Sequence, residues 1–158
     1  MHLSNQRQFQ QGFTLVELII AMAIIALLAR IAIPAYMESV NRGKRAQAQV
    51  AVTGLAQSFE RYFSNCNSYN SSTCVLGASI NASNAPTIYP PSVPSTGTAF
   101  YTLTVNIPAG GASYTISAAP VAGGSMANDK CGTFTLASDG TKNITGQAAG
   151  VAITDCWK

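Results

Sequence analysis

The sequence predicts an α+β fold in which a long, kinked amino-terminal α-helix packs on a four-stranded antiparallel β-sheet. Three observations carry this prediction. An apolar run fills positions 13–33, apolar residues with helical spacing follow it, and the second half of the chain alternates apolar and polar residues. Helical spacing indicates a helix with one buried face, and alternation indicates strands with one buried face.

The apolar run, Phe13 to Ile33, is long enough to cross the hydrocarbon core of a bilayer as a helix that rises about 1.5 Å per residue. Two ordinary interpretations are a cleaved secretory signal and a plain permanent anchor. Neither gives a reason for placing Glu17 inside the apolar run. The run therefore predicts a membrane span in which this carboxylate has a further task.

The helix is expected to continue into the folded part of the chain. Four apolar residues share one helical face: Val52, Leu55, Phe59 and Tyr62. We expect one helix from about Thr14 to Phe63, bent near Pro34 and loosened at Gly43. Such a helix is about 75 Å long, too long for a domain of about 100 residues to cover, so its first half should protrude.

The rest of the chain predicts a loop followed by strands. Positions 65–98 are rich in Asn, Ser and Pro, which favour a loop. Alternation then indicates strands at 101–107, 114–118 and 134–136. The glycine-containing turn sequences after the first and third of these strands are typical of antiparallel connections.

Charge is sparse and uneven along the chain. Charged residues make up 9% of the 158 residues, and apolar residues make up 47%. From Glu60 onward the basic and acidic side chains balance, which excludes a broad nucleic-acid-binding field. The remaining positive charge clusters at Arg42, Lys44 and Arg45, where we expect a collar facing solvent or lipid headgroups.

The cysteines indicate disulfides rather than a metal site or a catalytic site. Their number is even, no close C-x-x-C pair suggests zinc, and His2 is the only histidine. We therefore predict no catalytic site, no metal and no cofactor, and we do not expect an enzyme. Three pairings are possible. We predict the pairing of Cys66 with Cys74 and of Cys131 with Cys156, because each of these pairs encloses one coherent segment.

The amino-terminal motif resembles a known signal. Gly12-Phe13-Thr14-Leu15-Val16-Glu17 and the later Ala32-Ile33-Pro34-Ala35-Tyr36 are similar to the class III signal of type IV pilins and secretion pseudopilins. The resemblance implies that prepilin peptidase cuts between Gly12 and Phe13 and methylates the new amine. It also implies a leader at 1–12, a transmembrane and fibre-core half-helix at 13–35, and a periplasmic or extracellular head at 36–158.

The resemblance implies that two residues, Glu17 and Pro34, act in assembly of the fibre. A buried carboxylate and a buried amine are both costly unless they pair. Glu17 of an incoming subunit can pair with the Phe13 amine of its neighbour and so select the register of a fibre.

Arg30 departs from the family pattern, in which this position is small and apolar. It lies about 220° around the helix from Glu17, so the two cannot pair on one helix. Two interpretations stay open. Arg30 extends its side chain to the membrane interface, or it meets a partner on another subunit.

The carboxyl-terminal half carries a second resemblance. Cys131-Gly132-Thr133-Phe134-Thr135-Leu136, Asp139-Gly140-Thr141-Lys142 and Asp155-Cys156-Trp157-Lys158 look like the PilE and ComP group of minor pilins. This implies a structural subunit of a type IV pilus that acts in assembly, adhesion or twitching motility. Its partners would be other pilin subunits, and it would move from the inner membrane of a Gram-negative bacterium to an extracellular fibre.

Two alternatives accompany that expectation. One is a pseudopilin of type II secretion, and the other is a competence pilin that binds DNA for uptake. For the second, a bond between Cys131 and Cys156 would gather three lysines into a basic patch: Lys130, Lys142 and Lys158. The same bond would bring Asp129 and Asp155 beside them, which weakens the patch.

Overall fold

The computed structural model describes residues 12–71 and 73–157. The chain divides into two units, Met1–Ser39 and Val40–Lys158. Helix α1, Leu15–Cys66, contributes to both and stays helical across Pro34 and across Gly43. Its bounds lie within three residues of the predicted ones, and the expected loosening at Gly43 does not interrupt it.

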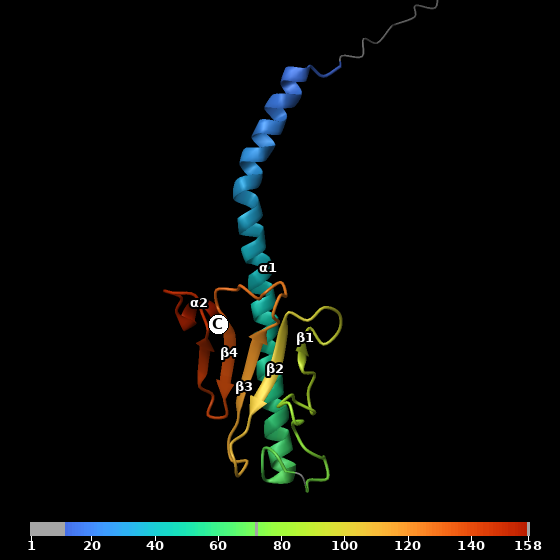
Figure 1. Ribbon diagram of the computed structural model, residues 1–158, viewed down its shortest axis with the longest axis vertical. Coiled ribbons are helices and arrows are strands. Elements are labelled where there is room, and N and C mark those ends of the chain that lie inside the picture. Colours follow the sequence, from blue (N-terminus) through green and yellow to red (C-terminus); the bar gives the residue numbers. More distant parts are fainter. Residues whose placement is uncertain (1–11, 72, 158) are drawn as a thin grey trace, which may run out of the picture. The chain divides into compact units, whose positions relative to one another are not determined.

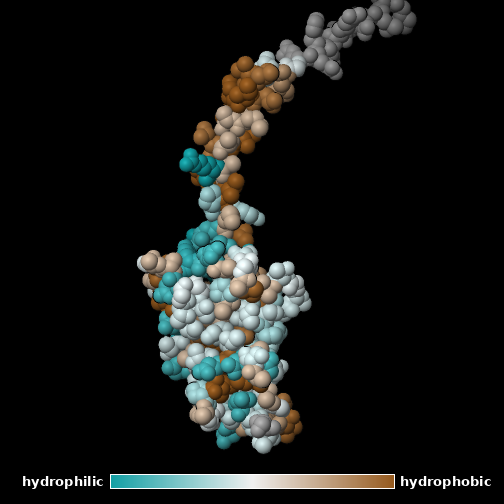
Figure 2. Space-filling model, in the orientation of Figure 1, coloured by the Kyte–Doolittle hydropathy of each residue, from teal (hydrophilic) through white to brown (hydrophobic). Residues whose placement is uncertain are grey.

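The first unit presents an apolar helix surface. Between Phe13 and Met37 the large apolar side chains are all exposed, and Phe13 is 85% exposed. The described residues contain one helix long and apolar enough to cross a membrane, and none of its most apolar window is buried. Figure 2 shows hydrophobic side chains along this stretch. Because exposed apolar surface of this extent is unfavourable in water, the segment requires a non-aqueous environment.

The second unit contains one antiparallel sheet in the order β1-β2-β3-β4-β5 (Figure 1). Its strands are Ser92–Val93, Tyr101–Asn106, Thr115–Pro120, Thr133–Ala137 and Lys142–Thr145. A short helix, α2, follows at Ile153–Cys156. The predicted α+β fold is confirmed, with the two-residue edge strand β1 added in the segment expected to be a loop.

The core of this unit lies between α1 and one face of the sheet. Strand β2 alternates as predicted, because Tyr101, Leu103 and Val105 are fully buried while the residues between them are more exposed. On α1, Val52, Leu55 and Phe59 are also fully buried. Burying each such side chain contributes about 1.5–3 kcal/mol, so this interface is the main support of the second unit.

Gly132 is required where the chain enters β4. Its φ is +62°, a conformation that side-chain-bearing residues rarely adopt. A Cβ at this position would also meet the carbonyl oxygen of Thr145 and lie 2.7 Å from the carbonyl carbon of Gly146. The glycine therefore allows the chain to pass from Cys131 into β4 directly beside the end of β5.

Candidate functional site

The expected processing junction lies just before α1. Gly12 and Phe13 are exposed and have no regular secondary structure, whereas Leu15 is already helical. The Glu17 backbone N–H donates to Thr14 Oγ1 at 3.2 Å, so Thr14 caps the helix. The junction is therefore accessible at the surface of the described residues, directly ahead of the capped helix. The rest of the expected leader, His2 included, lies outside the described residues.

Glu17 sits at the third helical position, where the positive end of the helix dipole favours a carboxylate. The spacing Thr-x-x-Glu is the sequence signature of a capped helix start, and it marks the beginning of α1 independently of the apolar run. Glu17 and Arg30 are both exposed in the first unit. Pairing of Glu17 with a neighbouring amine, and the two interpretations of Arg30, stay predictions.

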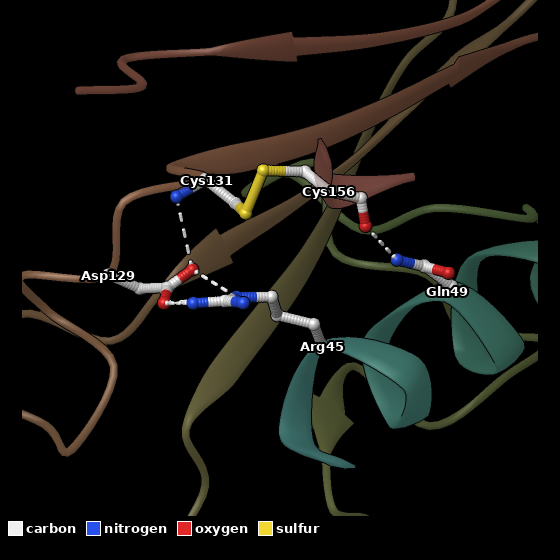
Figure 3. Close-up of polar contacts among 5 residues, drawn as sticks. All are labelled: Arg45, Gln49, Asp129, Cys131 and Cys156. Carbon is white, nitrogen blue, oxygen red and sulfur yellow. Dashed lines mark hydrogen bonds and ion pairs between the residues drawn. A yellow bond between two sulfur atoms is a disulfide. The ribbon is translucent and has the colours of Figure 1, made fainter. Parts of the chain in front are cut away.

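Arg45 forms a buried ion pair in the second unit, so the prediction that it belongs to an exposed basic collar is wrong. Its side chain is 5% exposed, and its Nη2 lies 2.5 Å from Asp129 Oδ1 in an ion pair (Figure 3). Arg45 Nε also donates to Asp129 Oδ2 at 2.9 Å. Arg45 is therefore not part of a solvent-facing or lipid-facing collar, because the segment before β4 folds over it and supplies a buried partner.

Lys44 also contacts other residues of the second unit. Its ammonium donates to Ser125 Oγ at 2.9 Å and lies 5.8 Å from the centroid of the Phe100 ring. Of the three residues expected to form the collar, only Arg42 is exposed. The connection between β3 and β4 therefore attaches to α1 through two successive basic residues.

The carboxyl-terminal disulfide lies beside this anchor. Cys131 and Cys156 are bonded, as expected from the sequence, and are 0% and 4% exposed. Asp129 Oδ2 accepts the Cys131 backbone N–H at 3.2 Å, and Gln49 Nε2 donates to the Cys156 carbonyl at 2.6 Å. The ends of the bridge are thus tied to α1 by two different routes.

The second disulfide, Cys66–Cys74, closes a small ring at the end of α1. Tyr62, 2% exposed, donates its hydroxyl to the Gly77 carbonyl at 2.6 Å and accepts the Ser71 N–H at 3.2 Å. These contacts fold the ring against the helix. Val75, beyond the ring, is fully exposed.

Two tyrosines of the second unit have hydroxyl groups whose pKa is shifted by their surroundings. Burial, and then hydrogen bonding to Glu60, raises the pKa of Tyr114 well above its usual range. Burial also raises the pKa of Tyr101, and the negative charge of Asp129 adds to this. Both phenols therefore lose their protons less readily than an exposed tyrosine does. The described residues hold no group of three His, Cys, Asp or Glu side chains that could bind a metal.

The two candidate DNA-contacting lysines that the structure describes, Lys130 and Lys142, lie toward opposite ends of the β4–β5 pair. Lys142 begins β5 opposite Leu136, near the β4–β5 turn, and its ammonium lies 5.6 Å from the centroid of the Trp157 ring. Lys130 precedes β4, so it lies toward the other end of this strand pair. Lys158 lies outside the described residues. The described lysines are therefore spread along the β4–β5 pair.

The acidic neighbours expected to cancel these lysines differ in their accessibility. The Asp129 side chain is 1% exposed and is paired with Arg45. Asp155 Oδ2 accepts the Ala152 backbone N–H at 3.0 Å at the start of α2, where it is exposed. Only Asp155 of these two therefore offsets positive charge at the surface.

Comparison with known proteins decides the family. Residues 34–135 match the profile described as type IV minor pilin ComP, DNA uptake sequence receptor. The chain belongs to this family of minor pilins. Residues 7–32 of the pilin separately match the prokaryotic N-terminal methylation motif, over the segment that contains Gly12, Phe13 and Glu17.

Curated relatives resemble the pilin over part of their length. Fimbrial protein EcpC of Eikenella corrodens is 42% identical over 37% of this chain and 39% of its own. The type IV major pilin protein PilA of Myxococcus xanthus is 36% identical over 44% of this chain and 32% of its own. The matches thus span about two fifths of these relatives or less. A solved type IV pilin from Shewanella oneidensis is 22% identical with a TM-score of 0.45, covering 74% of this chain and 97% of that one.

Proposed function

We propose that this pilin is a structural minor subunit of a type IV pilus. The observation that carries the proposal is the wholly exposed apolar helix of the first unit in a chain of the minor pilin family. A membrane can cover that surface before assembly, and the helices of other pilin subunits can cover it in a fibre. Both environments remove apolar surface from water, so one segment serves two stages.

The proposal assigns the early residues to successive steps. Prepilin peptidase removes residues 1–12 and methylates the amine of Phe13, while the helix at 13–35 holds the chain in the inner membrane of a Gram-negative bacterium. During assembly Glu17 pairs with the Phe13 amine of a neighbouring subunit, and Pro34 allows the helix to bend. The head, 36–158, then lies on the extracellular fibre, where it serves assembly, adhesion or twitching motility.

Fibre membership can be tested by labelling. An antibody against the head should bind, under immunogold electron microscopy, to fibres sheared from cells that express the pilin. Sparse labelling is expected for a minor subunit. A strain that lacks the gene is the control, and label confined to membranes in the expressing strain would contradict the proposal.

A second candidate function is capture of DNA. The observation that favours it is the family description, which names a DNA uptake sequence receptor. Burial of Asp129 supports it, because one expected acidic neighbour of the lysines is removed from the surface. Lys142 also lies over the Trp157 ring, so a basic and an aromatic side chain lie side by side at the candidate DNA site.

DNA binding should be weak and sensitive to salt. Three lysine–phosphate contacts imply a log–log salt slope no steeper than about −2.7. We expect the full chain in detergent micelles to shift double-stranded DNA on a gel at low ionic strength. The variant with Lys130, Lys142 and Lys158 all changed to Glu should not. Equal shifts for both proteins, or none for the unmodified chain, would remove these lysines as a DNA site.

A further inference from the structure

We propose that Arg45 and Gln49 of α1 position Cys131 and Cys156 for disulfide formation, so that packing of the sheet on the helix favours this bond. This role concerns formation of a disulfide in the head, 36–158, and goes beyond the proposed fibre function. Arg45 and Gln49 are four residues apart, so they lie one above the other on the same helix face.

The first route runs from Arg45 to Cys131. Both Nε and Nη2 of Arg45 donate to the Asp129 carboxylate, which fixes the carboxylate in a two-point contact. The same carboxylate accepts the Cys131 N–H through Oδ2 (Figure 3). The ion pair is buried on both sides, so it persists with little competition from water.

The second route runs from Gln49 to Cys156. The Gln49 amide donates directly to the Cys156 carbonyl at 2.6 Å. Cys131 and Cys156 are 25 residues apart in the sequence, yet each backbone is tied to the same face of α1. Fixing both partners on one rigid element raises the effective concentration of one thiol at the other.

Cys66–Cys74 provides an internal comparison, because its closure does not depend on this arrangement. Cys66 is the last residue of α1, and Cys74 follows after a separation of eight residues. Its ring is held through Tyr62, on a different part of the helix. Loss of the Arg45 and Gln49 contacts should therefore leave this disulfide unaffected.

The reaction requires an external disulfide as oxidant. One cysteine thiolate attacks that disulfide, forms a mixed disulfide and releases one thiol. The second cysteine thiolate attacks the protein sulfur of the mixed disulfide and releases the second thiol. The protein loses two electrons and two protons, and the external disulfide gains both to become two thiols.

The test measures an equilibrium constant for each disulfide. The full chain in detergent micelles is reduced, equilibrated in glutathione buffers of graded redox ratio, alkylated, and analysed by peptide mass mapping. Gln49→Leu should lower the constant for Cys131–Cys156 by about tenfold, while the constant for Cys66–Cys74 changes by less than about twofold. Gln49 is only part-buried, so this variant retains the core.

A double variant and a core variant separate positioning from stability. Arg45→Met with Asp129→Leu replaces the buried ion pair by apolar side chains but removes the acceptor for Cys131 N–H, and we expect a similar selective loss. Leu103→Ala weakens the core away from both bridges and should keep the ratio of the two constants within about twofold. An unchanged ratio in Gln49→Leu and in the double variant would overturn the proposal, as would an equal change of the ratio in Leu103→Ala.

Discussion

Replacing Asp129 by alanine should lower the free energy of unfolding by about 3–5 kcal/mol, because it leaves the Arg45 guanidinium buried without this carboxylate. The two side chains are 5% and 1% exposed, so the guanidinium is shielded from bulk water. The Cys131 N–H loses an acceptor at the same time. Urea unfolding of the full chain in detergent micelles, followed by Trp157 fluorescence, measures the change.

Asp139→Ala is the matched control for this experiment. Asp139 is also a carboxylate that accepts a backbone N–H, from Thr141 at 2.8 Å, but it lies exposed in the β4–β5 turn. Its loss should destabilise the protein much less than the loss of Asp129, because water can replace the exposed carboxylate. A loss for Asp129→Ala no larger than for Asp139→Ala would show that the ion pair does not anchor the head.

Replacing Glu17 by alanine should leave processing intact but lower the share of the pilin in fibres by about tenfold or more. The reason is that the Phe13 amine of a neighbouring subunit would be buried without its partner. Quantitative mass spectrometry of sheared fibres and of membranes, from cells that also express wild-type subunits, measures this share.

Glu17→Gln separates charge from size in the same assay. It keeps the shape of the side chain and its place in the first helical turn, but it cannot neutralise an amine. We expect it to be impaired as strongly as Glu17→Ala. Normal incorporation of Glu17→Gln would mean that the carboxylate charge has no part in assembly.

Local patterns made most of the fold predictable. The helical period of α1 and the alternation in β2 reflect which face of each element is buried. Each pattern can be seen within a few neighbouring residues of the sequence. Strand β1 was missed because Ser92 and Val93 are too few to show any alternation. Helix α2 was missed for the same reason, since it has four residues.

Contacts between distant residues were not predictable in the same way. Arg45 and Asp129 are 84 residues apart, and Arg45 in isolation resembles any basic residue that follows a membrane span. The prediction that the disulfide gathers the lysines into one patch was incomplete for a related reason. The disulfide brings Cys131 and Cys156 together, but the register of β4 and β5 decides where Lys142 lies relative to Lys130.

The most direct test of the proposed processing and fibre membership is the amino terminus of the protein in sheared fibres. Intact-mass measurement and terminal sequencing should find a chain that begins at Phe13 with a methylated amine. The exposed Gly12–Phe13 junction and the match to the methylation motif both support this start. A chain that begins at Met1, or one that begins near Tyr36, would contradict the account.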